Sequence, residues 1–310
     1  MTSSHDIPIV DAHHHIWDLA NHRYPWLDPD MPSIVGDTTA IRQSYDPVAY
    51  RSDTSAFNVV ATVHLDGGFD PSNPVGETRM VHAAFEKHGF PNAIVGSVRL
   101  DATDLADTID GHLKASHLFR GIRHIVAWHE IPRLSYVDRP DVLADASWVA
   151  GYRSLAAHEL SCDMQIYPSQ MADAAELAAS TPDIQMIINQ AGMPDGLVTG
   201  DFEPWRRGIR LMAQSPNVAF KISGFGMLRP DWTLADVRPL IEEAIEVFGT
   251  DRVMFGSNFP VDKLFGDFAR SFDVFLAATH ALSHADRIKV FAANAVRIYR
   301  IGSVSHHSKP

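Results

Sequence analysis

Cysteine is nearly absent from this 310-residue chain, which contains only Cys162. One cysteine cannot form a disulfide within the chain, and it cannot build a cysteine-rich metal site. A single cysteine in an apolar run is more typical of a small core residue than of a nucleophile, so we assign Cys162 to the core. The chemistry of the protein is therefore expected from other residue types.

Positive charge is also scarce, because 26 lysine and arginine residues face 38 acidic residues and the formal net charge is −12. Partners rich in phosphate require a basic surface, so neither a nucleic acid nor an anionic membrane is expected as a partner. A local basic pocket is compatible with this charge balance, which leaves an anionic small molecule open. We expect a small-molecule substrate, and a homo-oligomer remains open.

Long apolar runs are missing as well. No window approaches the roughly 18 apolar residues of a membrane span. The first ten residues, MTSSHDIPIV, lack the basic and apolar regions of a signal peptide, so a cytoplasmic protein is expected. No linker-like stretch or repeat divides the chain. We predict one domain over residues 1–302 and a flexible tail over 303–310, whose His306 and His307 are not expected to act as ligands.

Short apolar runs rich in β-branched residues alternate with longer segments of helical period, which is typical of parallel βα units. Eight such units without a glycine-rich phosphate turn after the first strand favour a single (β/α)8 TIM barrel of the α/β class over a doubly wound sheet. The predicted strands are residues 7–16, 58–67, 92–101, 119–128, 161–168, 184–192, 217–224 and 252–260. The predicted helices are residues 77–89, 104–116, 148–160, 170–181, 203–215, 234–249, 268–282 and 285–301.

The carboxyl ends of these strands are polar where an inert core would be apolar. In barrels of this class the reacting groups lie at that end of the strands, so these side chains are expected to converge on one ligand. They are His13, His14, His15, His64, Arg99, Arg123, His124, Gln165, Tyr167, Gln190, Lys221 and Asn258.

The loops after strands 1 and 4, residues 17–33 and 129–148, are long and contain prolines and aromatic residues. Loops of this length are usually functional or disordered, and rigid aromatic residues favour an ordered lid. The alternative is that these aromatic side chains only pack the loops onto the barrel rim. The residues concerned are Tyr24, Trp26, Trp128 and Tyr136.

The segment VDAHHHIWD at residues 10–18 ends the first strand with three consecutive histidines. Strand alternation predicts Asp11, His13 and His15 on the inner face of the barrel and His14 on the outer face. His13 and His15 then form an H-x-H pair at the mouth, which can hold a metal ion or transfer protons. A structural role is expected for His14.

Seven segments in this order and spacing resemble the amidohydrolase superfamily, in the amidohydrolase 2 branch with L-fuconolactonase-like and 2-pyrone-4,6-dicarboxylate lactonase-like enzymes. They are DAHHHIWD, YPWL, ETRMVHAA, RGIRH, INQAGMP, PNVAFKISG and DRVMFGSNFPVD, and they run through nearly the whole chain. The resemblance implies a (β/α)8 barrel and, as in the lactonase members, hydrolysis of a lactone that is rich in carboxylate or hydroxyl groups.

Two positions depart from the family pattern. Many relatives carry D-H-x-G after strand 6 and G-S-D-W-P after strand 8, whereas this chain has NQAG with Gln190 and GSNFP with Asn258. Members that bind metal use these two positions together with H-x-H. Amides are poor zinc ligands beside imidazoles, so no cofactor is required by this reading. A divalent metal such as zinc, held by His13 and His15, stays open, and Asn258 cannot act as the family's aspartate base.

Hydrolysis of a lactone needs an activated water, a stabilised oxyanion and a proton for the leaving alkoxide. We assign catalytic roles to His13 and His15 and consider Asp262 as the carboxylate nearest Asn258, with a surface pair to Lys263 as its alternative. Asn258 is included with these catalytic residues because of its place at the end of strand 8. The residues assigned to substrate binding are Trp26, His64, Arg123, His124, Trp128, His129, Gln165, Tyr167, Gln190 and Lys221.

Structural alternatives remain for three of the charged residues. Arg123 can form a salt bridge to another strand end such as Asp11, Lys221 can pair with Asp11, and Glu77 can serve only as a helix-start residue. The sequence therefore predicts a hydrolase that opens a small cyclic ester or related carbonyl ring. The alternatives are a metal-dependent decarboxylase or amidohydrolase of the same superfamily and a non-catalytic, ligand-binding barrel.

Overall fold

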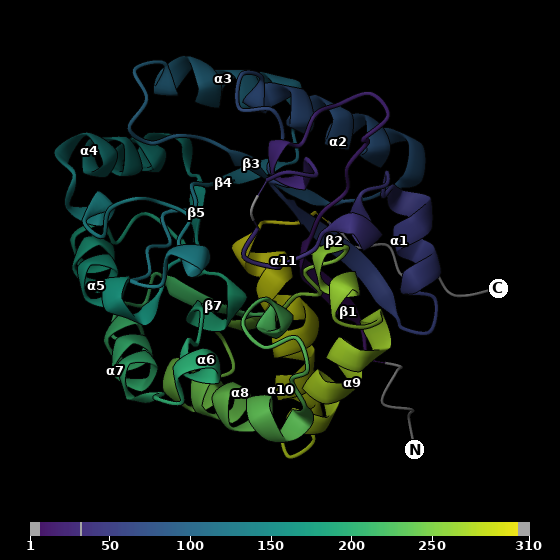
Figure 1. Cartoon of the computed structure of the whole chain (residues 1–310), viewed down its shortest axis with the longest axis vertical. Helices are drawn as coiled ribbons and strands as arrows, with labels where there is room; N and C mark the ends of the chain where they lie inside the picture. Colours follow the sequence, from purple (N-terminus) through teal and green to yellow (C-terminus); the bar gives the residue numbers. More distant parts are fainter. Residues whose placement is uncertain (1–6, 32, 303–310) are drawn as a thin grey trace.

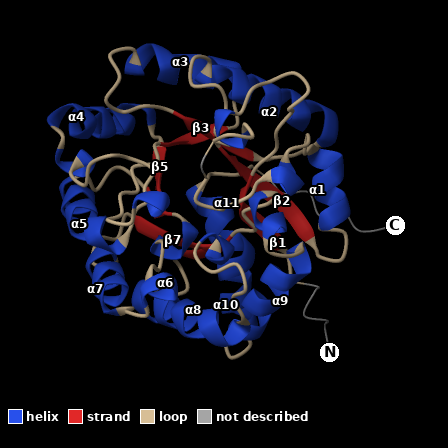
Figure 2. Ribbon diagram, in the orientation of Figure 1, coloured by secondary structure: helices blue, strands red, loops and turns tan. Residues whose placement is uncertain are grey.

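The structure is a computed structural model that describes residues 7–31 and 33–302, so the predicted tail at 303–310, with His306 and His307, lies outside it. Eight strands run parallel and follow one another in sequence order around a nearly closed barrel, with the helices outside (Figures 1 and 2). The predicted (β/α)8 barrel is confirmed. The strands are β1 (Ile9–His14), β2 (Val59–Leu65), β3 (Ala93–Ser97), β4 (Phe119–Arg123), β5 (Ser161–Met164), β6 (Met186–Ile188), β7 (Val218–Ile222) and β8 (Val253–Phe255).

The helices agree with the predicted segments, with two additions. The helix α1 and the single turn α6 lie in stretches where no helix was predicted, and the last segment is divided by a π-helical turn at Lys289–Ala293. The α-helices are α1 (Pro47–Asp53), α2 (Pro74–His88), α3 (Leu105–Ala115), α4 (Ala146–Ser154), α5 (Met171–Ser180), α6 (Gly196–Thr199), α7 (Glu203–Met212), α8 (Leu234–Phe248), α9 (Phe268–Ala278), α10 (His284–Ile288) and α11 (Asn294–Ile298). No helix among residues 7–31 and 33–302 has both the length and the apolar composition to cross a membrane.

Local sequence signals set where these helices begin and end. Asp46 precedes α1 and accepts a hydrogen bond from the Ala49 amide, which satisfies one of the free amides of the first turn. Thr233 and Asp236 form a capping box at the start of α8. Gly89 ends α2 in the left-handed conformation that favours glycine.

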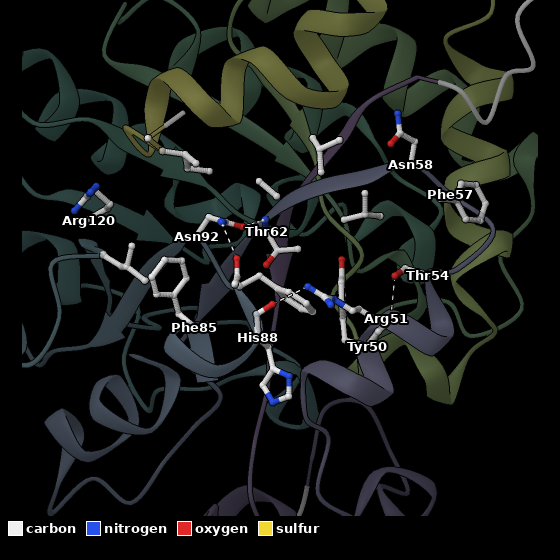
Figure 3. A pocket seen from close by; sticks show the side chains of 18 of the residues that line it. Tyr50, Arg51, Thr54, Phe57, Asn58, Thr62, Phe85, His88, Asn92 and Arg120 are labelled. Carbon is white, nitrogen blue, oxygen red and sulfur yellow. Dashed lines mark hydrogen bonds between the residues drawn. The ribbon is translucent and has the colours of Figure 1, made fainter. Parts of the chain in front are cut away.

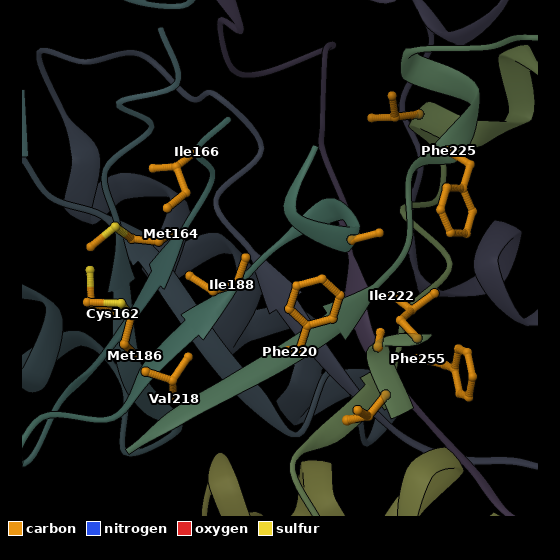
Figure 4. Packing of buried hydrophobic residues seen from close by; sticks show 14 of the residues in the cluster. Cys162, Met164, Ile166, Met186, Ile188, Val218, Phe220, Ile222, Phe225 and Phe255 are labelled. Carbon is orange, nitrogen blue, oxygen red and sulfur yellow. The ribbon is translucent and has the colours of Figure 1, made fainter. Parts of the chain in front are cut away.

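The apolar core has two layers, as alternation along parallel strands requires. One layer lies between the strands and the helices, and Figure 4 shows part of it on β5 to β8. The other layer fills the barrel, where side chains from the strands pack against α11 and the residues beside it. The inner layer includes Val10, Ala12, Val63, Val95, Ile187, Ala219, Met254, Ile298 and Tyr299. The helix α11 lies within the ring of strands in Figure 1.

The predicted inward orientation of Asp11 is wrong. Val10 and Ala12 belong to the inner layer, whereas the Asp11 carboxylate accepts a hydrogen bond from the hydroxyl of Tyr50 on α1, at 2.7 Å. The pairing of β1 with β2 shifts register between Asp11 and His14. This irregularity breaks the simple alternation and allows His13 to face the barrel interior although Asp11 does not.

Candidate active site

The segment after β8 closes the barrel against the end of β1. The backbone N–H of Asn258 donates to the His13 carbonyl at 2.7 Å, and the backbone N–H of His15 donates to the Phe259 carbonyl at 2.6 Å. These backbone bonds place Asn258 beside the two histidines at the carboxyl ends of the strands, which we call the mouth. A separate cavity of about 940 Å³ lies at the opposite end of the barrel, near the starts of β2, β3 and β4 (Figure 3).

His15 has the best-defined geometry of the candidate residues at the mouth. Its ring is buried, and Nδ1 lies 2.8 Å from the carbonyl oxygen of Leu65. A carbonyl can only accept, so Nδ1 carries the proton and Nε2 keeps its lone pair. Burial, followed by the positive charge of Arg123, holds the pKa of His15 well below its usual range. His15 is therefore neutral at pH 7 and has an unprotonated Nε2.

His13 faces His15 at a ring-centroid distance of 5.2 Å with nearly perpendicular planes. It is fully buried, and neither ring nitrogen has a hydrogen-bond partner among the described residues. Burial, then the charge of Lys221, lowers the pKa of His13 well below its usual range. Gly256 allows β8 to approach the backbone of His13 closely, because a Cβ atom there would lie 2.5 Å from the His13 Cβ. A neutral His13 has one donor and one acceptor free for a ligand.

A chain of hydrogen bonds connects the neutral amides that replace the family's ionisable groups. Ser223 donates to Gln190 Oε1 at 2.7 Å, Gln190 Nε2 donates to Asn258 Oδ1 at 2.9 Å, and Asn258 Nδ2 donates to Asp262 Oδ1 at 2.7 Å. The chain fixes the orientation of the Asn258 amide, so Oδ1 is the atom 3.4 Å from His15 Nε2. Two hydrogen-bond acceptors therefore lie side by side at the mouth.

The backbone at both amides is in the left-handed region, with φ of 53° at Gln190 and 57° at Asn258. Asparagine tolerates this conformation, but glutamine rarely adopts it, and such strain is often found at functional sites. Gly224 is required nearby, since a Cβ atom there would lie 2.1 Å from Gln190 Oε1.

Asp262 is buried at the mouth and does not form the surface pair considered above. Lys263 instead forms its ion pair with Asp53, at 2.6 Å. Burial raises the pKa of Asp262 to about 7, although the hydrogen bond from Asn258 opposes the shift. The carboxyl group therefore changes protonation near neutral pH, within reach of the amide chain.

The two cations of the barrel interior are paired with carboxylates, but neither partner is Asp11. The guanidinium of Arg123 contacts Asp66, with Nε 3.1 Å from Oδ2 and Nη2 bonded to the Asp66 carbonyl. Lys221 Nζ lies 2.6 Å from Asp163 Oδ1, and the Tyr299 hydroxyl donates to the same oxygen at 2.8 Å. Burial lowers the pKa of Lys221 to about 8, against the opposing effect of Asp163.

Two of the histidines assigned to substrate binding are turned away from the mouth. His124 Nδ1 accepts from the Leu100 amide at 3.2 Å and the Trp148 indole at 3.1 Å, so it joins the end of β3 to α4. His64 Nδ1 accepts from the Ile16 amide at 3.2 Å, and its Nε2 lies 3.4 Å from Glu77 on α2. Both are therefore placed in the scaffold, and Glu77 is a buried side chain that also accepts from the Gly67 amide.

Tyr167 and His129 position the loop after β4. The Tyr167 hydroxyl donates to the Leu134 carbonyl at 2.9 Å, so it is not free to donate to a substrate. The His129 ring packs against Tyr167 at 4.7 Å and lies 3.4 Å from Asp195 Oδ2. The Trp128 amide in the same loop donates to Gln170 at 3.0 Å.

The predicted lid aromatics are ordered. Trp26 donates from its indole to the Gly67 carbonyl at 2.7 Å. Tyr136 is 41% exposed, and burial of its hydroxyl raises its pKa, against the opposing effects of nearby Gln165 and Arg123. His15 is only 3% exposed, so the mouth is closed to solvent at this side chain.

The amidohydrolase family model matches residues 10–301, nearly the full length. The chain belongs to the amidohydrolase family. This amidohydrolase is 44% identical to the uncharacterized protein y4mH of Sinorhizobium fredii, over 96% of this chain and 99% of the relative. It is 28% identical to an L-fucono-1,5-lactonase of Burkholderia ambifaria, over 94% of this chain and 95% of the relative.

A solved structure supports the fold of this amidohydrolase. It is an amidohydrolase from Burkholderia multivorans with bound zinc, with a TM-score of 0.79, 22% identity, and coverage of 94% of this chain and 99% of that one. The zinc ion is a property of that protein. Whether this chain can hold zinc depends on the side chains at its own mouth.

The donors at the mouth do not fit a zinc centre. His13 and His15 supply two imidazoles, but no group of three or more histidine, cysteine, aspartate or glutamate residues among residues 7–31 and 33–302 is arranged to hold a metal. The neighbouring amides are bonded to each other, and the carboxylate of Asp262 is bonded to Asn258. Zinc sites use three or four histidine, cysteine or carboxylate ligands, so we derive no step through a metal.

The sequence-based assignment missed three residues of the interior. Asp66 and Asp163 are the partners of Arg123 and Lys221, and Asn189 is fully buried with both side-chain amide atoms unpaired among the described residues. Strand alternation indicated two of them. Asp163 is two residues before Gln165 and Asn189 two residues after Ile187, which faces inward.

Proposed function

We propose that this amidohydrolase hydrolyses a small cyclic ester, with His15 as the general base. One observation carries the proposal, namely that His15 Nε2 and Asn258 Oδ1 are adjacent acceptors 3.4 Å apart. A water molecule that donates one hydrogen to each of them has its lone pairs directed away from both. Such a water is held in the orientation that attack on a carbonyl carbon requires.

In this mechanism His15 takes a proton from the water as the oxygen–carbon bond forms. The carbonyl oxygen becomes an oxyanion, which the free N–H of His13 and the remaining N–H groups of Arg123 can stabilise. The ring carbon–oxygen bond then breaks, and protonated His15 returns the proton to the leaving alkoxide. The product is the open-chain hydroxy acid, and no other reactant is needed.

Two L-fucono-1,5-lactonases, at 28% and 25% identity, support a lactone as the substrate class. Asn258 holds the water but cannot accept its proton, so the base must be a neighbouring group. His15 meets this requirement because the Leu65 carbonyl fixes its tautomer.

The proposal is tested by assaying the purified full chain against a panel of 1,5-lactones and 1,4-lactones that includes L-fucono-1,5-lactone, with proton release as the signal. We expect turnover of at least one lactone and its loss in His15→Asn. Absence of turnover across the panel, or full activity of the variant, contradicts the proposal.

A further inference from the structure

Three neutral polar side chains in the barrel interior have buried atoms without a hydrogen-bond partner among residues 7–31 and 33–302. They are both ring nitrogens of His13, both amide atoms of Asn189, and Nε2 of Gln165. His13 and Asn189 are 0% exposed and Gln165 is 1% exposed. A buried polar group without a partner is costly, so these groups require an occupant.

The three side chains share the inner face of the barrel. Ile187 on β6 belongs to the inner apolar layer and Ile188 to the outer layer, so Asn189, in extended backbone, faces inward. The backbone N–H of Asn189 donates to the Met164 carbonyl at 2.8 Å. This bond sets Gln165 beside Asn189 on the neighbouring strand. His13 faces the interior from β1, close enough to Lys221 for its charge to act on the ring.

Several neighbouring polar groups are satisfied by the protein itself, although Asp163 Oδ2 is not. Asn258 and Gln190 belong to the hydrogen-bonded amide chain, and Arg123 is paired with Asp66. The unpaired neutral groups of Asn189 and Gln165 therefore lie on neighbouring strands at the mouth, which His13 also faces, as expected of a ligand sub-site.

The chemistry of the patch favours an uncharged ligand. Lys221 and Arg123 are already neutralised by Asp163 and Asp66, so neither leaves net positive charge for an anion. Asn189 Oδ1 and Asp163 Oδ2 are unpaired acceptors, and they would repel a carboxylate. A hydroxyl group both donates and accepts, and it satisfies an amide and a neutral imidazole together.

We infer that Asn189, with Gln165 and His13, forms a sub-site for hydroxyl groups of an uncharged, hydroxylated lactone. This inference rests on the proposed lactone hydrolysis for the identity of the ring. It assigns Asn189 the role of a specificity residue, and it replaces the anionic substrate that the interior lysine and arginine suggested.

The test compares Asn189→Leu with the wild type on two substrates. These are δ-valerolactone, whose ring has no hydroxyl groups, and the hydroxylated 1,5-lactone that the wild type hydrolyses best. We expect kcat/KM for the hydroxylated lactone to fall about 100-fold, because a site built to bind hydroxyl groups loses its partner. The value for δ-valerolactone is expected to change by less than about threefold.

A matched control is Asn294→Leu. Asn294 is a buried asparagine at the start of α11. Its side-chain amide donates to the Thr250 and Val253 carbonyls near the start of β8, away from the mouth. This variant is expected to lower stability while the ratio of kcat/KM for the two lactones stays at the wild-type value. An equal loss on both substrates in Asn189→Leu overturns the inference, and so does retention of both activities, since a sub-site that holds only ordered water predicts that result.

Binding of D-glucono-1,5-lactam, measured by calorimetry, separates this inference from the proposed hydrolysis. If the wild type hydrolyses no lactone but binds the lactam, and Asn189→Leu weakens binding at least tenfold, the sub-site stands and the hydrolase proposal fails. If the wild type hydrolyses lactones and Asn189→Leu has the wild-type substrate ratio, the hydrolase proposal stands and the sub-site fails. Absence of both lactam binding and lactone turnover overturns both.

Discussion

His15 donates from Nδ1 to the backbone carbonyl of Leu65 at 2.8 Å, so its Nε2 lone pair is directed to the mouth of the barrel. This single bond fixes both the tautomer and the ring orientation. Histidines that bind metals or transfer protons are commonly held in this way by a carbonyl or carboxylate on the other nitrogen. In this chain the adjacent acceptor is the Asn258 amide oxygen, which favours proton transfer from a bound water.

Replacing His15 with asparagine distinguishes the roles of its two ring nitrogens. In His15→Asn the side-chain amide can still donate to the Leu65 carbonyl, but no basic nitrogen remains at the Nε2 position. We expect kcat for lactone hydrolysis to fall about 10²- to 10⁴-fold, the usual contribution of a general base, with stability close to the wild type. Steady-state kinetics and urea unfolding of the same preparation measure both quantities.

His14 supplies the matched control for this prediction. Its Nε2 contacts Thr62 Oγ1 at 2.9 Å, and its ring packs on Tyr50 at 4.6 Å, away from the mouth. His14→Asn should therefore lower the free energy of unfolding by about 1–3 kcal/mol and leave kcat within a few-fold. A variant pattern in which His14 matters for kcat and His15 does not is incompatible with the mechanism.

Asp262 is predicted to make stability depend on pH. Its pKa is about 7 in the folded chain against an ordinary value of 3.8, so the folded state binds more protons between these values. The stabilisation from this group is present below about pH 4 and is lost as the pH rises through 7. In Asp262→Asn this loss is removed, so the free energy of unfolding of the variant relative to the wild type should rise by about 4 kcal/mol from pH 4 to pH 8.

Urea unfolding at a series of pH values measures this difference, because the other titrating groups are common to both proteins and cancel. A constant difference between Asp262→Asn and wild type over pH 4–8 would show that the carboxyl group titrates normally.

The barrel was predictable from local sequence because each strand and helix carries its own apolar periodicity. Every predicted strand contains an observed one, and their order around the sheet follows the chain. The convergence of His13, His15, Gln190 and Asn258 at the mouth also followed, because the carboxyl ends of all parallel strands meet at one end of a barrel.

The partners of the interior charges could not be predicted in this way. The orientation of Asp11 depends on a register shift in β1 that alternation does not encode, and Arg123 pairs with Asp66 rather than Asp11. The partner of Lys221 depends on where α11 ends, since Tyr299 meets Asp163 from 136 residues further along the chain. Such contacts are set by packing, not by local pattern.

The buried pair of Lys221 and Asp163 yields a stability prediction. Both side chains are 0% exposed, so Lys221→Met leaves an uncompensated carboxylate in the barrel. We expect the single substitution to cost about 3–5 kcal/mol of unfolding free energy. Adding Asp163→Asn removes the stranded charge, and the double variant should regain most of this loss. Equal stability of the single and double variants in urea unfolding would contradict a stranded charge at this position.

The metal requirement gives the last prediction, because the amides at Gln190 and Asn258 are bonded to each other and no third ionisable ligand joins His13 and His15 among the described residues. We expect the wild-type protein, purified with zinc in the medium, to contain well under one zinc per chain and to keep its lactonase activity after dialysis against a chelator.

The double variant Gln190→His with Asn258→Asp restores an imidazole and a carboxylate beside the histidine pair, which meets the usual donor set for zinc. It should take up close to one zinc per chain by elemental analysis. Stoichiometric zinc in the wild type, lost together with activity on chelation, would show that two imidazoles and two amides suffice and that the water is activated by the metal instead of by His15.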